Sequence, residues 1–283
     1  MEIGNPPWTR NEILASIDEF LTVYDDRPIK DNQGGMQAPH MFAVWFMARK
    51  LSPELIIESG IWKGQSTWLL EQACPEAKLV SIDLNLKRRE YISDRAIYSD
   101  RDFCEQDWTN ISNMSDRTLV FFDDHQNAYK RMQQCKWFGF KHVILDDNYP
   151  SYKGDCYSLK KVLANTGFQP AGSQKALVFN KVSAKIFNKL ARLSGIRPFF
   201  LTPQYESTSI PPNDFDSCML HKNLEIYYEF PPVCITDKTR WGADWKDSYP
   251  TPEPLLDRPL EPSQNVFLDE AMSYTWICYA KLK

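Results

Sequence analysis

The sequence lacks a long apolar run, a secretion signal and an excess of positive charge. Its longest apolar stretches, such as residues 41–47, are too short to cross a bilayer. Residues 1–12 are polar and acidic rather than charged and then apolar, as a secretion signal would be. The formal net charge is −4, whereas non-specific binding to nucleic acid relies on positive charge that neutralises phosphates. We therefore expect a cytoplasmic protein that binds neither a membrane nor nucleic acid.

Paired cysteines are also missing. The seven cysteines are scattered, their number is odd, and no two are spaced as C-x-x-C. A disulfide framework or a zinc site would need such pairing, so we expect reduced thiols in core positions. No internal repeat is visible. With 283 residues, of which 43% are hydrophobic, the chain can bury a substantial core.

What the sequence does contain is an alternation of short apolar runs and helical patterns. Buried strands are predicted at 54–59, 78–84, 118–124 and 141–147, with a weaker strand at 96–103. Helices are predicted at 66–74 and 127–139, and Gly139 is placed as a helix stop. Such alternation is typical of βαβ units with right-handed crossovers. The predicted fold is a Rossmann-like, doubly wound α/β sheet that is mostly parallel.

We expect one domain with three parts. Residues 1–52 carry two amphipathic helices, 11–26 and 40–51, around a polar segment at 30–39. The stretch 27–39 is either a lid over the cofactor or a linker. Residues 53–195 form the cofactor-binding core. Residues 196–283 add strands at 224–233 and 274–283, and a long Pro/Trp-rich excursion lies between these strands.

The turn after the first predicted strand contains Gly60 and Gly64, and the following Ser66 and Thr67 can cap the next helix. The G-x-x-x-G spacing differs from the motifs of dinucleotide sites and P-loops, which argues against NAD and against ATP hydrolysis. Glu58 stands two residues before the first glycine. A carboxylate at this strand tip suits a cationic ligand and repels a pyrophosphate.

Two further acids follow the next strands. In open α/β sheets, ligands bind outside the carboxyl ends of the strands. There Asp83, after the second strand, can accept both hydroxyls of a ribose, and Asp107, after the third, can accept from an adenine amino group. The pattern indicates a ligand with an adenine, a ribose and a positively charged tail.

This E-x-G-x-x-x-G pattern with an acid after the second strand resembles the class I S-adenosylmethionine-dependent methyltransferases. The resemblance covers roughly residues 53–150, and the C-terminal strand pair is similar to the antiparallel hairpin of that family. It implies a cofactor site for S-adenosyl-L-methionine made by Glu58, Gly60, Gly64, Ser66, Asp83 and Asp107.

Acidic residues also follow the fourth and fifth strands, in "FFDDHQN" and "VILDDNYP". Carboxylate and amide oxygens suit Mg²⁺ or Ca²⁺, and without a cation the carboxylates would repel one another. Within the methyltransferases this resembles the metal-dependent O-methyltransferase branch, which includes the catechol and macrocin types. The resemblance implies Asp123, Asp147 and Asn148 as metal ligands. The pair Asp146 and Asp147 is a competing register, and Asp124 is an alternative to Asp123.

His125 is the candidate catalytic base, because macrocin-type enzymes place a carboxylate base at the same offset from the first ligand. The catechol type uses a lysine near this place, where the chain has Gln126 or Asn127. Tyr149, Tyr152 and Lys153 are candidate substrate contacts, and the segment that holds them follows the metal motif.

The sequence therefore predicts an enzyme that transfers a methyl group from S-adenosylmethionine to a hydroxyl of a small polar acceptor, such as a sugar or a secondary metabolite. A divalent cation would chelate the acceptor and lower the pKa of its hydroxyl. Two alternatives stay open: another metal-dependent enzyme on the same scaffold, such as a hydroxylase, and a non-catalytic binding protein. A homodimer is compatible with the sequence.

Overall fold

The computed structural model describes residues 4–109, 111, 116–170, 209–239, 252–257, 259–274 and 276–283. One seven-stranded sheet has the order β3-β2-β1-β4-β5-β7-β6. Its strands are Leu55–Ser59 (β1), Lys78–Ile82 (β2), Ala96–Ser99 (β3), Thr118–Phe122 (β4), His142–Leu145 (β5), Leu224–Glu229 (β6) and Cys278–Leu282 (β7). Strands β1 to β5 are parallel, and β7 runs antiparallel to both β5 and β6. The predicted Rossmann-like sheet with an antiparallel C-terminal pair is confirmed.

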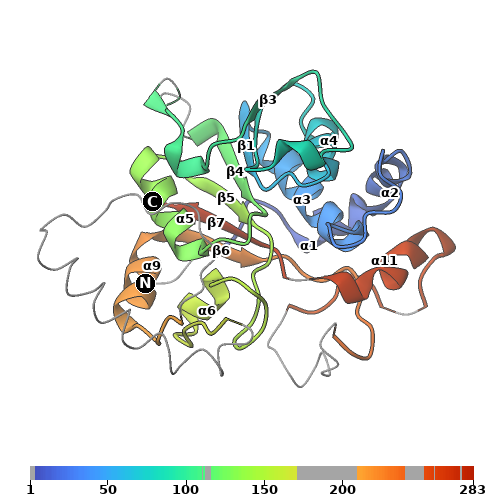
Figure 1. Ribbon diagram of the computed structural model, residues 1–283. Coiled ribbons are helices and arrows are strands. Elements are labelled where there is room, and N and C mark those ends of the chain that lie inside the picture. The colour runs from blue at the N-terminus through green and yellow to red at the C-terminus, as the bar shows by residue number, and fades with distance from the viewer. Residues whose placement is uncertain are drawn as a thin grey trace, which may run out of the picture.

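Helices lie on both faces of this sheet (Figure 1). They are Arg10–Ala15 (α1), Ile17–Asp25 (α2), Ala38–Leu51 (α3), Gln65–Ala73 (α4), Ala128–Phe138 (α5), Leu159–Leu163 (α6), Asp214–Asn223 (α9) and Asn265–Asp269 (α11). Short 3₁₀ turns cover Leu86–Arg88, Phe103–Glu105, Pro262–Gln264 and Ala271–Ser273. None of the helices in the described ranges combines the length and apolar character needed to span a bilayer.

The first predicted helix and the start of α4 differ from the prediction. The helix expected at 11–26 is divided at Ser16, whose hydroxyl donates to the Glu12 carbonyl at 2.8 Å and so competes with the backbone. Ser66 and Thr67 do not cap α4, because the cap residue is Gly64, with φ +95°, and the helix already begins at Gln65. Gly139 ends α5 with φ +86°, as predicted.

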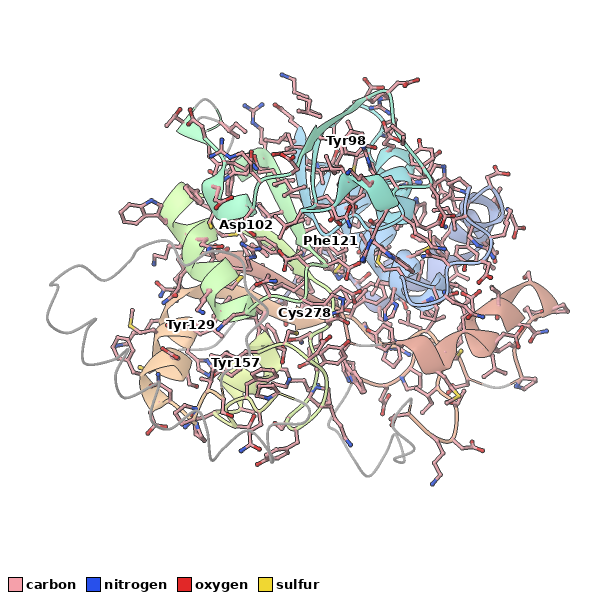
Figure 2. All side chains as sticks on the ribbon, viewed as in Figure 1. Tyr98, Asp102, Phe121, Tyr129, Tyr157 and Cys278 are labelled. Atoms are coloured by element: carbon pink, nitrogen blue, oxygen red, sulfur yellow. The ribbon has the colours of Figure 1, made fainter. Side chains whose placement is uncertain are left out.

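Successive side chains of the central strands point into two separate cores, because strand residues alternate between the faces of a sheet. Ile56 and Phe121 belong to the core under α1 to α4 and α11, whereas Ile57 and Val120 belong to the core under α5, α6 and α9. Figure 2 shows Phe121 in the middle of the molecule, with Tyr129 and Tyr157 on the side of α5 and α6. All of β1 and β4 is buried, which leaves the strand ends as the places where polar chemistry can occur.

Candidate active site

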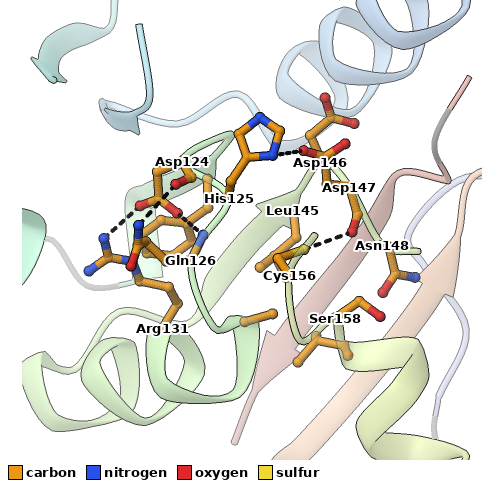
Figure 3. A pocket seen from close by; sticks show the side chains of 13 residues that line it. Asp124, His125, Gln126, Arg131, Leu145, Asp146, Asp147, Asn148, Cys156 and Ser158 are labelled. Atoms are coloured by element: carbon orange, nitrogen blue, oxygen red, sulfur yellow. Dashed lines mark hydrogen bonds and ion pairs between the residues drawn. The ribbon is translucent and has the colours of Figure 1, made fainter. Parts of the chain in front are cut away.

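A pocket lies between the carboxyl ends of β4 and β5 (Figure 3). Its lining is formed by Phe122, Asp124, His125, Gln126, Ala128, Arg131, Leu145, Asp146, Asp147, Asn148, Cys156, Ser158 and Leu159. Residues with positive φ follow three strands at this edge: Trp62 (+46°) after β1, His125 (+53°) after β4 and Asp147 (+55°) after β5. Strained backbone at non-glycine residues persists only where the surroundings force it, and it concentrates at functional sites.

The loop between β1 and α4 is shaped by close backbone approaches. Gly60 has φ +99°, and a Cβ atom there would overlap the backbone carbonyl of Asp123. Gly64 has φ +95°, and a Cβ atom there would overlap the carbonyl of Tyr91. Both glycines are therefore required by the fold. The first contact also places this loop directly against the turn that follows β4.

Asp83 holds the same loop from the end of β2. Its Oδ2 accepts the backbone N–H groups of Ile61 at 3.0 Å and Trp62 at 2.9 Å, and its Oδ1 accepts from the N–H of Asn85 at 2.8 Å. A carboxylate has about four acceptor positions, so most of the capacity of Asp83 is used by the protein's own backbone. The acid predicted to bind a ribose is thus also a structural part of the loop.

Glu58 is completely buried beneath this loop. Its Oε2 accepts hydrogen bonds of 2.7 Å from the hydroxyls of Thr67 and Ser81. Burial, reinforced by the nearby Asp83 carboxylate, raises the pKa of Glu58 to about 7, although the hydroxyls of Ser66, Thr67 and Ser81 oppose this rise. Ser66 and Thr67 therefore serve Glu58 in the first turn of α4 instead of capping the helix.

The polar segment expected to be a lid or a linker contacts the Gly60–Gly64 loop. The N–H of Ile29 donates to Oε1 of Gln65 at 3.2 Å. Gly35 lies so close to the ring of Trp62 that a Cβ atom there would be only 2.8 Å from it. These contacts place the segment against the loop and against the first residue of α4.

Asp123, His125 and Asp147 come together at the ends of β4 and β5. One side-chain ligand atom from each lies within 4.8 Å of the others. His125 Nδ1 is 2.9 Å from Oδ2 of Asp147 and 3.2 Å from Oδ1 of Asp155. Burial and the carboxylates of Asp146 and Asp147 raise the pKa of Asp123 well above its ordinary value. The four acids leave an excess of negative charge at this edge of the sheet.

The imidazole of His125 is the counter-ion of these acids. Burial by itself would lower the pKa of His125, but its contacts with Asp147 and Asp155 raise that pKa to about 12. At neutral pH both ring nitrogens therefore carry a proton, and the ring is positively charged. In this arrangement His125 neutralises part of the cluster and has no free electron pair with which to act as a base.

Asp124 points away from this cluster. It accepts from the hydroxyl of Ser59 at 2.7 Å and pairs with Nη2 of Arg131 at 2.7 Å. Arg131 is almost fully buried and also binds Asp102 through two contacts of 2.9 and 2.7 Å. Asp124 is thus part of a buried ionic network, and the alternative in which it replaces Asp123 finds no support. Sequence reasoning missed both Asp102 and Arg131, which carry no motif.

Asn148 also has its amide committed elsewhere. Its Oδ1 accepts from the backbone N–H of Lys160 at 2.9 Å, and its Nδ2 donates to the hydroxyl of Tyr227 at 2.8 Å. Figure 3 shows its side chain on the far side of Asp147 from His125. Asp146 lies nearer to the cluster, with its Oδ1 4.0 Å from Nε2 of His40. Both registers, Asp146 with Asp147 and Asp147 with Asn148, stay predictions, and His40 of α3, which sequence reasoning did not identify, lies beside Asp146.

The remaining candidates have simpler surroundings. Asp107 is exposed and accepts from the N–H and the hydroxyl of Thr109, at 3.0 and 2.6 Å. Tyr149 is buried, and burial and the adjacent Asp147 raise its pKa. Tyr152 is 86% exposed and so is open to a ligand. Part of the Pro/Trp-rich excursion predicted between the last two strands lies outside the described residues.

No known protein family matches the chain, and no curated protein sequence does so. Among solved structures, the chain is similar to "cmcI-N160 SAH" at 15% identity and a TM-score of 0.34, over 52% of this chain and 81% of that one. It is similar to the O-methyltransferase TomG from Streptomyces achromogenes, in complex with SAM, at 13% identity and a TM-score of 0.43, over 98% and 97% of the two chains. It is also similar to an O-methyltransferase from Bacillus cereus in complex with SAH, at 13% identity and a TM-score of 0.40, over 95% of this chain and 91% of that one.

Proposed function

We propose that the protein is an S-adenosylmethionine-dependent O-methyltransferase that acts, with the help of a divalent cation, on a small hydroxylated acceptor. One observation carries the proposal: Gly60 of the loop after β1 packs directly on the backbone of Asp123, the first residue of the acidic cluster. A cofactor bound at that loop and an acceptor bound at that cluster would therefore be neighbours. Methyl transfer between two bound molecules requires such proximity.

The donor set fits a hard cation. Asp123 and Asp147 provide carboxylate oxygens in one cluster at this edge of the sheet, and burial, reinforced by the carboxylates of Asp146 and Asp147, raises the pKa of Asp123. Oxygen ligands of this kind are those that Mg²⁺ and Ca²⁺ prefer. When bound, the cation would act as a Lewis acid that makes an acceptor hydroxyl easier to deprotonate. We propose Asp123 and Asp147 as its ligands, with Asp146 in place of Asn148.

The other residues have proposed roles that follow their positions. Glu58, Ser66 and Asp83 build the floor of the cofactor loop around Gly60 and Gly64. Asp83 would keep an acceptor position for the ribose, and Asp107 would accept from the adenine. With its carboxylate neighbours ionised, His125 has a pKa of about 12 and is already protonated. Neutralisation of these carboxylates would lower that pKa, and only then could His125 act as a base. All seven cysteines are thiols, the form that a reducing compartment such as the cytoplasm maintains.

The test is turnover with a panel of acceptors. Purified protein is incubated with S-adenosylmethionine and with catechols, simple sugars or amino sugars, in Mg²⁺ or in a chelator, and S-adenosylhomocysteine is quantified. The proposal expects release of S-adenosylhomocysteine with at least one hydroxylated acceptor, and its loss with the chelator. Calorimetry with S-adenosylmethionine provides the decisive control, since absence of binding at high protein concentration overturns the proposal.

A further inference from the structure

We propose that Asn148 is not a cation ligand but the centre of a hydrogen-bonded clamp, formed with Lys160, Tyr227 and Glu229, that fixes the conformation of Asp147. The inference rests on the proposed function, in which Asp147 binds the cation. It concerns a positioning role, because none of the clamp side chains has to touch the cation or the acceptor.

The clamp is a closed ring of contacts between three elements. Asn148, after β5, accepts from the Lys160 N–H of α6 at 2.9 Å and donates to the Tyr227 hydroxyl of β6 at 2.8 Å. That hydroxyl donates to Oε1 of Glu229 at 2.9 Å, and Oε2 of Glu229 binds the ammonium of Lys160 at 2.5 Å. Lys160 closes the ring, since its backbone and side chain both take part.

The ring needs an amide at position 148. Tyr227 gives its only proton to Glu229, so its oxygen must accept one from its other neighbour. The NH₂ group of Asn148 supplies that proton, while its carbonyl oxygen satisfies an N–H in the first turn of α6, where helices leave such groups unpaired. An aspartate would bring a second acceptor to the hydroxyl and a buried charge beside Glu229.

Asp147 is the residue that this ring controls. It has φ +55° and is buried, and its carbonyl accepts from the N–H of Tyr149 at 2.7 Å. The N–H of Asn148 donates to the carbonyl of Trp276 at 2.8 Å, so the peptide after Asp147 is also fixed. A return of Asp147 to the extended backbone would turn Asn148 out of the ring. The clamp therefore offsets the strain that aims the Asp147 carboxylate at His125 and Asp123.

Strand β6 offers a matched control. Tyr227 and Glu229 are two residues apart and share one face of the strand, whereas Tyr228 faces the other core and packs on Trp8, with ring centroids 5.6 Å apart. Tyr227→Phe and Tyr228→Phe each remove one hydroxyl from neighbouring positions. Only the first change opens the clamp.

The first measurement is a calorimetric titration with Mg²⁺ alone, and it includes Asn148→Asp. We expect Tyr227→Phe to weaken Mg²⁺ binding by about 10-fold, which is the lower end of the effect of groups that orient metal ligands. We expect Asn148→Asp to weaken it as well, and Tyr228→Phe and the affinity for S-adenosylmethionine to be unchanged. If the wild type binds Mg²⁺, tighter binding by Asn148→Asp would mean that Asn148 is a ligand, and unchanged binding by Tyr227→Phe would mean that the ring does not fix Asp147. Either result would overturn the clamp.

The second measurement needs no cation. Amide hydrogen exchange of residues 147–149 should accelerate in Tyr227→Phe, by about 10-fold or more, and stay at the wild-type rate in Tyr228→Phe. Thermal unfolding of both variants checks that each is folded. If the wild-type protein binds no Mg²⁺, the proposed cation site fails, but faster exchange in Tyr227→Phe still supports the clamp. Equal exchange in both variants overturns the clamp whatever the cation result.

Discussion

The acid after β2 and the acids after β4 and β5 lie at the same edge of one sheet, but the protein treats them differently. Asp83 is satisfied by N–H groups of its own loop, so the cofactor side is already complete as a hydrogen-bonded structure. Asp123 and Asp147 face each other, with the His125 imidazolium as the positive charge between them. The half of the edge at β1 and β2 is organised by backbone N–H groups. The half at β4 and β5, called the acidic half, holds excess negative charge that a cation would balance.

The largest effect is a loss of stability, and it is expected at Arg131, beside the acidic half of the edge. Arg131→Met leaves the buried carboxylates of Asp102 and Asp124 without their partner, and breaking a buried ion pair in this way costs about 3–5 kcal/mol. Urea unfolding measures the loss. Arg117→Met is the control, because Arg117 and Glu54 form an exposed pair that contributes about 0–1 kcal/mol. Equal stability of the two variants would contradict the buried network.

The same network predicts the acid limb of the stability curve. Burial opposes ionisation of Asp102, but Arg131 holds the pKa of that carboxyl at about 2. This pKa lies below the unfolded value of about 3.9, so the stabilisation is present above pH 4 and is lost as the pH falls towards 2. The difference in unfolding free energy between the wild type and Arg131→Met should narrow over this range.

The second prediction tests whether a change in the acidic half affects Mg²⁺ binding without affecting S-adenosylmethionine binding. Asp147→Ala removes a proposed ligand and should weaken Mg²⁺ binding on the order of 100-fold or more, beyond the effect of groups that only orient ligands. Binding of S-adenosylmethionine in the absence of Mg²⁺ should change little, because the loop and Asp83 are untouched. The Mg²⁺-dependent shift of the melting temperature reports the first effect. Asp155→Ala, which removes a more exposed neighbour of His125, should keep most of that shift.

The third prediction concerns the buried Glu58. Its pKa of about 7 lies above the usual value of 4.5, so the protonated form is favoured by folding. The resulting stability is present at low pH and is lost as the pH rises through 7. Between pH 5 and 7 the wild type should lose about 2 kcal/mol relative to Glu58→Gln, since one pKa unit corresponds to about 1.4 kcal/mol. Parallel stability curves would show that Glu58 is ionised in the folded protein.

The smallest change in ligand affinity is expected at Asp83. Asp83→Ala leaves the N–H groups of Ile61 and Trp62 without their acceptor, and each partly buried donor of this kind costs about 1–3 kcal/mol. Affinity for S-adenosylmethionine should fall by about 10-fold as the loop loosens, and affinity for Mg²⁺ in the absence of cofactor should stay the same. Asp100→Ala, which changes an exposed acid of the same region, is the control. Loss of both affinities together would show that the two halves are not separate.

Strand positions and strand ends were accessible from the sequence because they depend on local patterns. Apolar runs such as 118–124 gave β4, and the residues that follow a strand necessarily reach the same edge of a parallel sheet. For the same reason the sequence alone was enough to group Asp123, His125 and Asp147. The glycine turn was also accessible, because positive φ and close approach favour glycine.

The partners of the polar side chains were not accessible. Asn148 meets Tyr227, 79 positions further along the chain, and Arg131 meets Asp102, 29 positions earlier. Asn148 was therefore predicted as a ligand, although its amide completes a ring with β6. Ser66 and Thr67 were predicted to cap α4, although their hydroxyls face Glu58. In each case a tertiary partner determines which of several local uses of a polar group is realised.

The missing Cβ atom of Gly60 has a consequence for thermodynamics. Because the loop after β1 and the turn after β4 touch through bare backbone, no side chain between them can yield when one of them shifts. Occupation of the loop should therefore change the free energy of occupying the acidic cluster, and the reverse change must have the same size, since linkage is reciprocal. Because Gly60 has a hydrogen atom in place of a side chain, binding at the loop after β1 and binding at the acidic cluster should be coupled.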